Sequence, residues 1–153
     1  MECGVDGVIV ADLPPEESGP LRAEAHVAGL DLIHLVAPTS TPDRMRKIAR
    51  ASSGFVYMVS LTGVTGARAQ LPAELAQHLR TLRGITTKPI CVGFGIATPA
   101  QAAAVGRAAD GVIVGSAIVQ LVEKHAGNPD LVTKIGDFIA SLKDPLRPAP
   151  TAP

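Results

Sequence analysis

Five short apolar runs, each separated from the next by a segment with helical signals, place the strongest constraint on how this chain can fold. The runs are Gly7–Ala11, Leu32–Val36, Phe55–Val59, Pro89–Val92 and Gly111–Val114. Each run is continuously apolar rather than alternating, which is typical of strands covered on both faces. Strand, helix and strand in succession, with no hairpin signal between them, predict parallel strands joined by right-handed crossovers.

Three of the intervening segments begin with recognisable helix-start signals. Thr41 precedes Pro42, so a capping hydroxyl would be followed by proline at the first helical position. Thr98 and Gln101 have the spacing of a capping box, in which each side chain satisfies a backbone N–H of the other residue. Pro129 opens the last segment, where apolar residues then recur at helical intervals. These signals predict helices that start near positions 42, 99 and 129.

The composition limits both the core and the possible partners. Hydrophobic residues make up 46% of the chain but aromatic residues only 3%, so we expect a core of Val, Ile, Leu and Ala. Fourteen basic residues balance fourteen acidic ones, which gives no electrostatic reason to expect nucleic acid or an anionic membrane as a partner. No apolar stretch reaches the roughly 18 residues of a membrane span, and no signal peptide is visible. We expect a cytoplasmic protein. The four histidines share no metal-ligand spacing, so we expect no metal site.

Two α/β architectures are compatible with five strand–helix units. An open, doubly wound sheet of five strands would be a complete domain at 153 residues. A (β/α)₈ barrel needs about 250 residues, so three of its units would be absent. Patterning alone slightly favours the open sheet. The last ten residues, 144–153, contain four prolines and few apolar anchors, and we expect them to form a disordered tail.

The last two apolar runs each lead into a glycine at the junction with the following helix. Without a Cβ, Gly95 and Gly115 would let a ligand approach the backbone N–H groups closely, and a helix N-terminus adds partial positive charge. Ile96 would belong to one wall of such a site and Ser116 to the other. An extra short helix over 116–125 is also predicted, and phosphate-binding barrels commonly use such a helix with these two loops. The alternative is that both glycines form ordinary strand-to-helix turns.

A loop of small and hydroxylic residues, SLTGVTGAR at 60–68, follows the third run. Its composition suits a mobile lid that wraps an anionic ligand, and it equally suits a flexible connector.

Four motifs together resemble the tryptophan synthase α subunit. They are SLTGVTGAR, VADLPPEES at Val10–Ser18, VGFGI at Val92–Ile96 and VGSAIV at Val114–Val119. Their order and spacing agree with that family over residues 4 to 143. The resemblance implies a partial TIM (β/α)₈ barrel whose five parallel strands correspond to the last five units, with an extra short helix after the final strand. The phosphate-binding half of that barrel would occupy residues 1–143.

The resemblance also implies an activity. The family is a carbon–carbon lyase of tryptophan biosynthesis that cleaves indole-3-glycerol phosphate to indole and glyceraldehyde 3-phosphate without a cofactor, and passes the indole to a β subunit. The residues that the resemblance assigns to the substrate phosphate are Gly66, Gly95, Ile96, Gly115 and Ser116. Phe94 and Ile113 would belong to the indole pocket. Tyr57 would lie near the glycerol chain, or else be a core aromatic. Thr65, in the lid, would support the catalytic aspartate.

The catalytic glutamate and aspartate that the family implies have no counterpart in this chain. We therefore expect a truncated chain that is inactive alone, since the reaction needs an acid for the indole carbon and a carboxylate near the indole nitrogen. Asp12 lies at a strand end and could substitute, although a structural or interface role is the stronger expectation. Two alternatives remain. One is a non-catalytic phosphate-binding module, or one that docks a β subunit through Asp12–Pro15. The other is another phosphate-binding barrel enzyme, acting on a different sugar or aryl phosphate.

Overall fold

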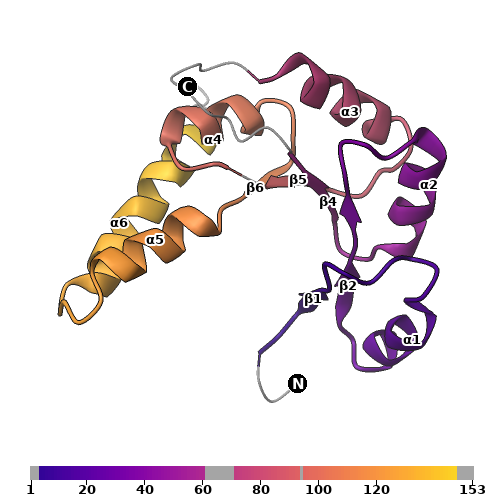
Figure 1. The fold of residues 1–153 in the computed structure, drawn as a ribbon, viewed down its shortest axis with the longest axis horizontal. Coiled ribbons are helices and arrows are strands. Elements are labelled where there is room, and N and C mark those ends of the chain that lie inside the picture. Colours follow the sequence, from indigo (N-terminus) through magenta and orange to yellow (C-terminus); the bar gives the residue numbers. More distant parts are fainter. Residues whose placement is uncertain (1–3, 61–70, 94, 148–153) are drawn as a thin grey trace, which may run out of the picture.

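The computed structural model describes residues 4–60, 71–93 and 95–147, and these form strands and helices that alternate except for the consecutive strands β2 and β3 and the consecutive helices at the C-terminal end (Figure 1). The strands are β1 (Gly7–Ile9), β2 (Asp31–Ile33), β3 (Leu35–Val36), β4 (Val56–Val59), β5 (Ile90–Gly93) and β6 (Gly111–Ile113). The helices are α1 (Gly19–Val27), α2 (Pro42–Ala51), α3 (Ala73–Arg83), α4 (Pro99–Gly106), α5 (Ser116–Lys124) and α6 (Leu131–Lys143), followed by the 3₁₀ helix η1 (Asp144–Leu146). All five predicted runs contain strand.

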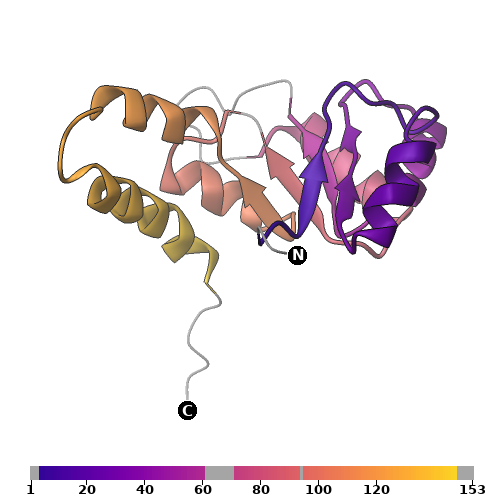
Figure 2. The same cartoon turned by 90° about the horizontal axis from the view of Figure 1, so that it is seen from below.

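The order of the strands decides between the two architectures. β1 pairs with β2, and β3, β4, β5 and β6 pair in that order, every pair being parallel (Figure 2). An open doubly wound sheet reverses its strand order at a switch point. The described strands instead follow the chain in one direction, as the strands of a (β/α)₈ barrel do. The fold is therefore a partial barrel, and the open-sheet alternative is wrong.

The predicted run Leu32–Val36 is divided into β2 and β3 at His34. Two serine hydroxyls after α2 accept its backbone N–H groups: His34 N donates to Ser52 Oγ (3.0 Å) and Leu32 N donates to Ser53 Oγ (2.8 Å). At β2 these bonds to serine side chains take the place of backbone pairing with β4. Regular pairing with β4 begins only at Leu35, in β3.

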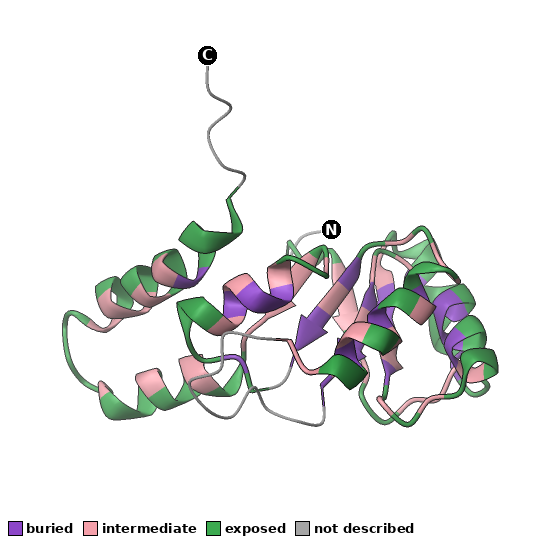
Figure 3. Cartoon of the chain, turned by 90° about the horizontal axis from the view of Figure 1, so that it is seen from above, coloured by how far each residue is buried: buried purple, intermediate pink, exposed green. Residues whose placement is uncertain are grey.

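The core lies between the strands and the helices that cover their outer face (Figure 3). Val56 and Met58 are fully buried toward α2 and α3, while Tyr57 and Val59 on the opposite, inner face are half-buried. Among the described residues, only the outer face of the strands is therefore fully covered. The sequence predicts that both faces of the strands are covered. The core is aliphatic as expected, except that Met45 and Met58 also belong to it.

The predicted helix starts are close to those observed. Thr41 Oγ1 accepts from Arg44 N at the start of α2. Thr98 and Gln101 form a complete capping box at the start of α4. The last helix begins two residues later than the predicted Pro129, at Leu131.

The C-terminal helices form an antiparallel pair that extends away from the rest of the molecule (Figure 1). α5 is the predicted extra short helix. The chain then returns to α4, where Leu146 of η1 occupies the space that a Cβ on Gly106 would fill. Residues 144–147, expected to be part of a disordered tail, thus include a 3₁₀ turn against α4; residues 148–153 lie outside the described part. No helix in 4–60, 71–93 or 95–147 is both long and apolar enough to span a membrane.

Candidate functional site

A cavity of about 310 Å³ lies at the C-terminal ends of the last strands. Parallel strands bring their C-terminal ends to the same edge, so residues far apart in sequence meet there. The lining residues are Tyr57, Gly95, Ile96, Ile113, Gly115 and Ser116. All six were predicted as site residues. The other three predicted site residues, Thr65, Gly66 and Phe94, lie outside the described residues.

The turn after β5 forms one wall of the cavity. Gly95 adopts φ = +73°, a left-handed conformation that L-residues with a side chain rarely take, so glycine is needed here for the backbone itself. The next side chain, Ile96, is only 3% exposed and joins the hydrophobic core. Ile96 therefore anchors the turn, and the turn presents mainly main-chain atoms to the cavity.

The start of α5 forms the opposite wall. Gly115 is the N-cap residue with φ = −120°, and its carbonyl accepts from Ile118 N (2.9 Å) and Val119 N (3.1 Å). The first N–H groups of a helix have no intrahelical acceptor, so those of Ser116 and Ala117, which precede the bonded Ile118, are available at the cavity. A Cβ built on Gly115 meets no atom of the described residues within 4 Å. The packing of this described part therefore does not require glycine at this position.

Tyr57 reaches the cavity from β4. Its ring lies across Gly93 of β5: a Cβ on Gly93 would stand 2.6 Å from Tyr57 Cε2 and 2.7 Å from Cζ. Burial raises the pKa of Tyr57, so its hydroxyl stays protonated and able to donate a hydrogen bond at neutral pH. Tyr57 is thus half-buried on the cavity wall and is not a fully buried core aromatic.

Gly93 is a residue whose role the sequence did not reveal. It lies within the VGFGI motif, but its contribution is the space that it leaves for the ring of Tyr57. Strand alternation is the sequence signal that could have indicated this role. It places Cys91 and Gly93 on one face of β5, and Ile90 and Val92 on the other.

The cavity is suited to an anion that also carries an apolar group. None of its six described lining residues is charged. An anion would therefore be held by backbone N–H groups, the α5 dipole and the hydroxyls of Ser116 and Tyr57. Ile113 supplies apolar surface beside them. Asp12, exposed after β1, does not line this cavity, and the described residues contain no cluster of His, Cys, Asp or Glu able to hold a metal ion.

Comparison with known proteins identifies the family. The family model described as "Tryptophan synthase alpha chain" matches residues 1–145. The chain belongs to the tryptophan synthase alpha chain family. This confirms the resemblance drawn from its four motifs.

Individual members of the tryptophan synthase alpha chain family agree with this assignment. The chain is 49% identical over 142 residues to the alpha chain of Citrifermentans bemidjiense, covering 93% of this chain and 53% of that protein. It is 52% identical over 141 residues to the alpha chain of Gloeobacter violaceus, covering 92% and 51%. The chain thus spans about half the length of these relatives.

Solved structures have the same fold. A structure from Aquifex aeolicus superimposes with a TM-score of 0.81 at 36% identity, covering 96% of this chain and 53% of that one. A chain of the tryptophan synthase α₂β₂ complex from Pyrococcus furiosus superimposes with a TM-score of 0.80 at 31% identity, covering 92% and 56%. Both matches cover about half of the other chain, as expected for a partial barrel.

Proposed function

We propose that this chain supplies the phosphate-binding half of a lyase that cleaves indole-3-glycerol phosphate to indole and glyceraldehyde 3-phosphate in tryptophan biosynthesis. The observation that supports it most is the single cavity shared by Tyr57, Gly95 and Gly115 in a chain of this family. The turn after β5 and the start of α5 would hold the phosphate through main-chain N–H groups. No cofactor is proposed.

The rest of the substrate would extend from the phosphate along the inner face of the strands. Ile113, together with Phe94, would contact the indole ring. The hydroxyl of Tyr57 would donate to the glycerol chain, and Gly66 and Thr65 of the 60–68 loop would close over the ligand. The cavity offers the apolar side chain of Ile113 as well as the hydroxyls of Tyr57 and Ser116, which supports a ligand with both an apolar ring and a phosphate.

Cleavage of the substrate requires groups that this cavity does not contribute. The indole carbon must gain a proton as its bond to the glycerol chain breaks, and a glycerol hydroxyl must lose one as the aldehyde forms. The six described lining residues include no carboxylate. We therefore propose that the acid and base come from the other half of a complete barrel, and that this chain alone does not turn over substrate.

The proposed partner is a β subunit, as in the α₂β₂ complex from Pyrococcus furiosus. Asp12–Pro15 follows β1 and lies at the same strand end as the cavity. The segment is well fixed: Leu13 N donates to Val10 O (3.3 Å), and Ser18, fully buried, donates from Oγ to Pro15 O (2.9 Å). The backbone that carries the exposed side chain of Asp12 is therefore fixed, which supports a docking role for this segment. A cytoplasmic location remains a prediction.

The absence of a carboxylate from the described cavity lining favours one alternative, a non-catalytic phosphate-binding or β-subunit-docking module. Ligand preference distinguishes three functions: the proposed half of an indole-3-glycerol phosphate lyase, a general phosphate-binding module, and a barrel enzyme for another phosphate. Indole-3-propanol phosphate carries both the ring and the phosphate, while inorganic phosphate and glycerol 3-phosphate lack the ring. Calorimetric titration should give the tightest binding for indole-3-propanol phosphate. Equal affinity for all three would remove the indole assignment.

A pair of variants tests the site itself. Gly115→Val should abolish binding of indole-3-propanol phosphate, because the new side chain enters the cavity where the phosphate would lie. Gly136→Val is the matched control, since Gly136 is exposed on α6 and a Cβ there also has no neighbour within 4 Å in the part of the chain that the structure describes. Unchanged affinity in Gly115→Val, with the fold retained, would contradict the phosphate site.

A further inference from the structure

A groove between α1 and α2 lies on the outer surface of the fold, away from the strand-end cavity. It has a volume of about 740 Å³ and continues into a second hollow of about 270 Å³, because Arg22, Arg50 and Ala51 line both. Arg22 comes from α1 and Arg50 from the last turn of α2, so two guanidinium groups from different helices share one groove.

Neither arginine has a partner among the described residues, unlike several other arginines near the groove or elsewhere in the fold. Arg44 pairs with Glu16, Arg46 with Asp43 and Arg83 with Asp110. Among residues 4–60, 71–93 and 95–147, Arg22 and Arg50 have neither an ion pair nor a side-chain hydrogen bond. Two like charges in one groove repel each other, and a shared anion would convert that repulsion into attraction.

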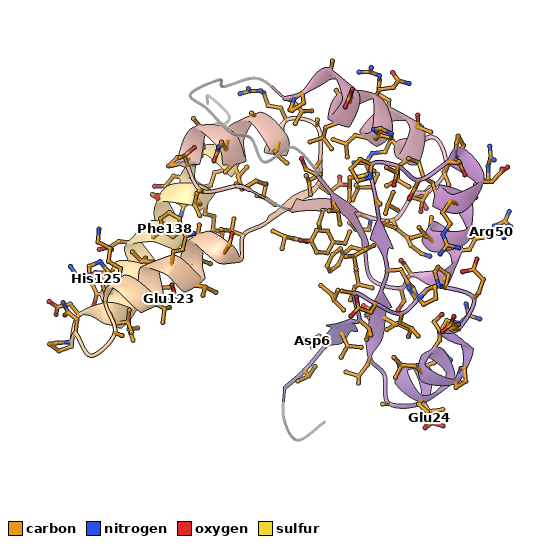
Figure 4. The ribbon with its side chains drawn as sticks, viewed as in Figure 1. Asp6, Glu24, Arg50, Glu123, His125 and Phe138 are labelled. Carbon is orange, nitrogen blue, oxygen red and sulfur yellow. The ribbon has the colours of Figure 1, made fainter. Side chains whose placement is uncertain are left out.

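The acids near the groove leave an excess of positive charge. Glu16 is taken by Arg44 and lies 3.9 Å from Lys47. Glu24 projects from the side of α1 that faces away from α2, whereas Arg50 lies at the outer edge of α2 (Figure 4). Asp31 is the remaining acid in the groove lining, and its carboxylate is packed against Gly54, where a Cβ would stand 2.5 Å from Oδ2.

The buried side chain of His34 lies near enough to Arg22 and Arg44 for their charges to act on it. His34 is 2% exposed, and its Nε2 has no hydrogen-bond partner among the described residues. Burial is the main cause that lowers the pKa of His34, and the charges of Arg22 and Arg44 lower it further, against the opposing effect of a hydrogen bond to the backbone of Leu13.

The floor of the groove is suited to the body of a small molecule. Leu32 and Ala51 supply apolar surface, and both are buried. Ser52 and Ser53 also line it; their oxygens accept from backbone N–H groups, which leaves each hydroxyl hydrogen able to donate. His26 adds a further ring nitrogen at the α1 side.

We propose that this groove binds a small phosphorylated molecule, with its phosphate held between Arg22 and Arg50. A phosphate offers three oxygens and up to two negative charges, which matches two guanidinium forks better than a single carboxylate does. The site would be separate from the strand-end cavity and does not depend on the proposed lyase activity.

The test uses the Gly115→Val chain, so that the strand-end cavity does not contribute. Titration with inorganic phosphate should shift the side-chain Nε–Hε NMR signals of Arg22 and Arg50 in a saturable manner, and acetate at equal ionic strength should shift them much less. Arg22→Gln and Arg50→Gln should each weaken phosphate binding roughly tenfold, the effect of losing one charge-assisted interaction.

Arg46→Gln is the matched control, because Arg46 is on α2, is paired with Asp43 and does not line the groove. Its phosphate affinity should equal that of the parent. The proposal is overturned if saturating phosphate leaves both arginine signals in place, if neither groove variant loses affinity, or if Arg46→Gln loses as much as they do. Phosphate binding by the groove, together with no binding of indole-3-propanol phosphate to the chain that keeps Gly115, would contradict only the proposed lyase function.

Discussion

The ring of Tyr57 on β4 lies over Gly93 on β5, in the space that any side chain at position 93 would need. The two residues are offset in the ladder, since Tyr57 pairs with Cys91 and Gly93 pairs with Val59. This diagonal contact fixes the tyrosine ring against the wall of the strand-end cavity.

Gly93→Ala should displace the Tyr57 ring and destabilise the fold by about 1–3 kcal/mol, as overpacking commonly does. Chemical denaturation of Gly93→Ala, Tyr57→Leu and the double variant measures the coupling. We expect the double variant to be more stable than the sum of the single effects, because a smaller side chain at position 57 removes the clash. Strict additivity would show that the contact does not limit position 93.

Gly95 and Gly115 should respond differently to alanine. Gly95→Ala places a side chain at positive φ and should cost about 1–2 kcal/mol of unfolding free energy. Gly115→Ala adds a methyl group that meets no described atom within 4 Å, so the stability of the variant should stay within about 0.5 kcal/mol of the parent while ligand affinity falls. Thermal melts paired with calorimetric titrations separate the two effects. A large loss of stability in Gly115→Ala would mean that the glycine serves the turn itself.

Lys88, in the loop before β5, caps the C-terminal end of α2. Its Nζ donates to Ala49 O and to Ser52 O, both at 2.6 Å. Lys88→Met should therefore cost about 1–3 kcal/mol, since it leaves these carbonyls without a charged donor. Hydrogen exchange should accelerate in the last turn of α2. Lys124→Met, at an exposed lysine in the last turn of α5, should change neither quantity.

Asp110 should make the free energy of unfolding depend on pH in the acid range. Its Oδ2 accepts from Ile90 N (2.8 Å) and from Arg83 Nη2 (2.6 Å), and the pKa of Asp110 is lowered first by the backbone bond and then by Arg83. A lowered folded-state pKa means that the stabilisation is fully present above the unfolded-state pKa of about 3.9, and is lost as pH falls through the folded-state value.

The measurement is unfolding free energy against pH for the parent and for Asp110→Asn. The variant should lose stability at neutral pH and should show a smaller fall below about pH 4, where the parent loses the same interaction. Asp137→Asn, at an exposed residue on α6, serves as the control. Parallel curves for the parent and Asp110→Asn would rule out this carboxylate as a source of acid sensitivity.

Local signals in the sequence predict much of this fold because they act within a few residues. The hydroxyl of Thr98 and the amide of Gln101 satisfy each other inside one turn, so their spacing is sufficient to predict the helix start. The division of one strand at His34 could not be predicted in this way. It depends on Ser52 and Ser53, which reach the strand only after α2 has been packed against it.

The candidate site shows the same distinction. The glycines at the ends of the last two strands could be predicted to meet, because parallel strands end at one edge. The contact between Tyr57 and Gly93 could not, since it depends on how far a ring on one strand leans over the next. The unpaired state of Arg22 and Arg50 likewise becomes visible only when the positions of all neighbouring acids are known.

The unbroken order of strands from β3 to β6 has a consequence for biosynthesis. Each of these strands pairs with the one made just before it, so no pairing within this sheet waits for a segment that is made much later. The ribosome releases β4 before β5, and β5 before β6. Every newly emerged unit therefore finds its pairing surface already assembled, and this part of the barrel can grow in step with translation.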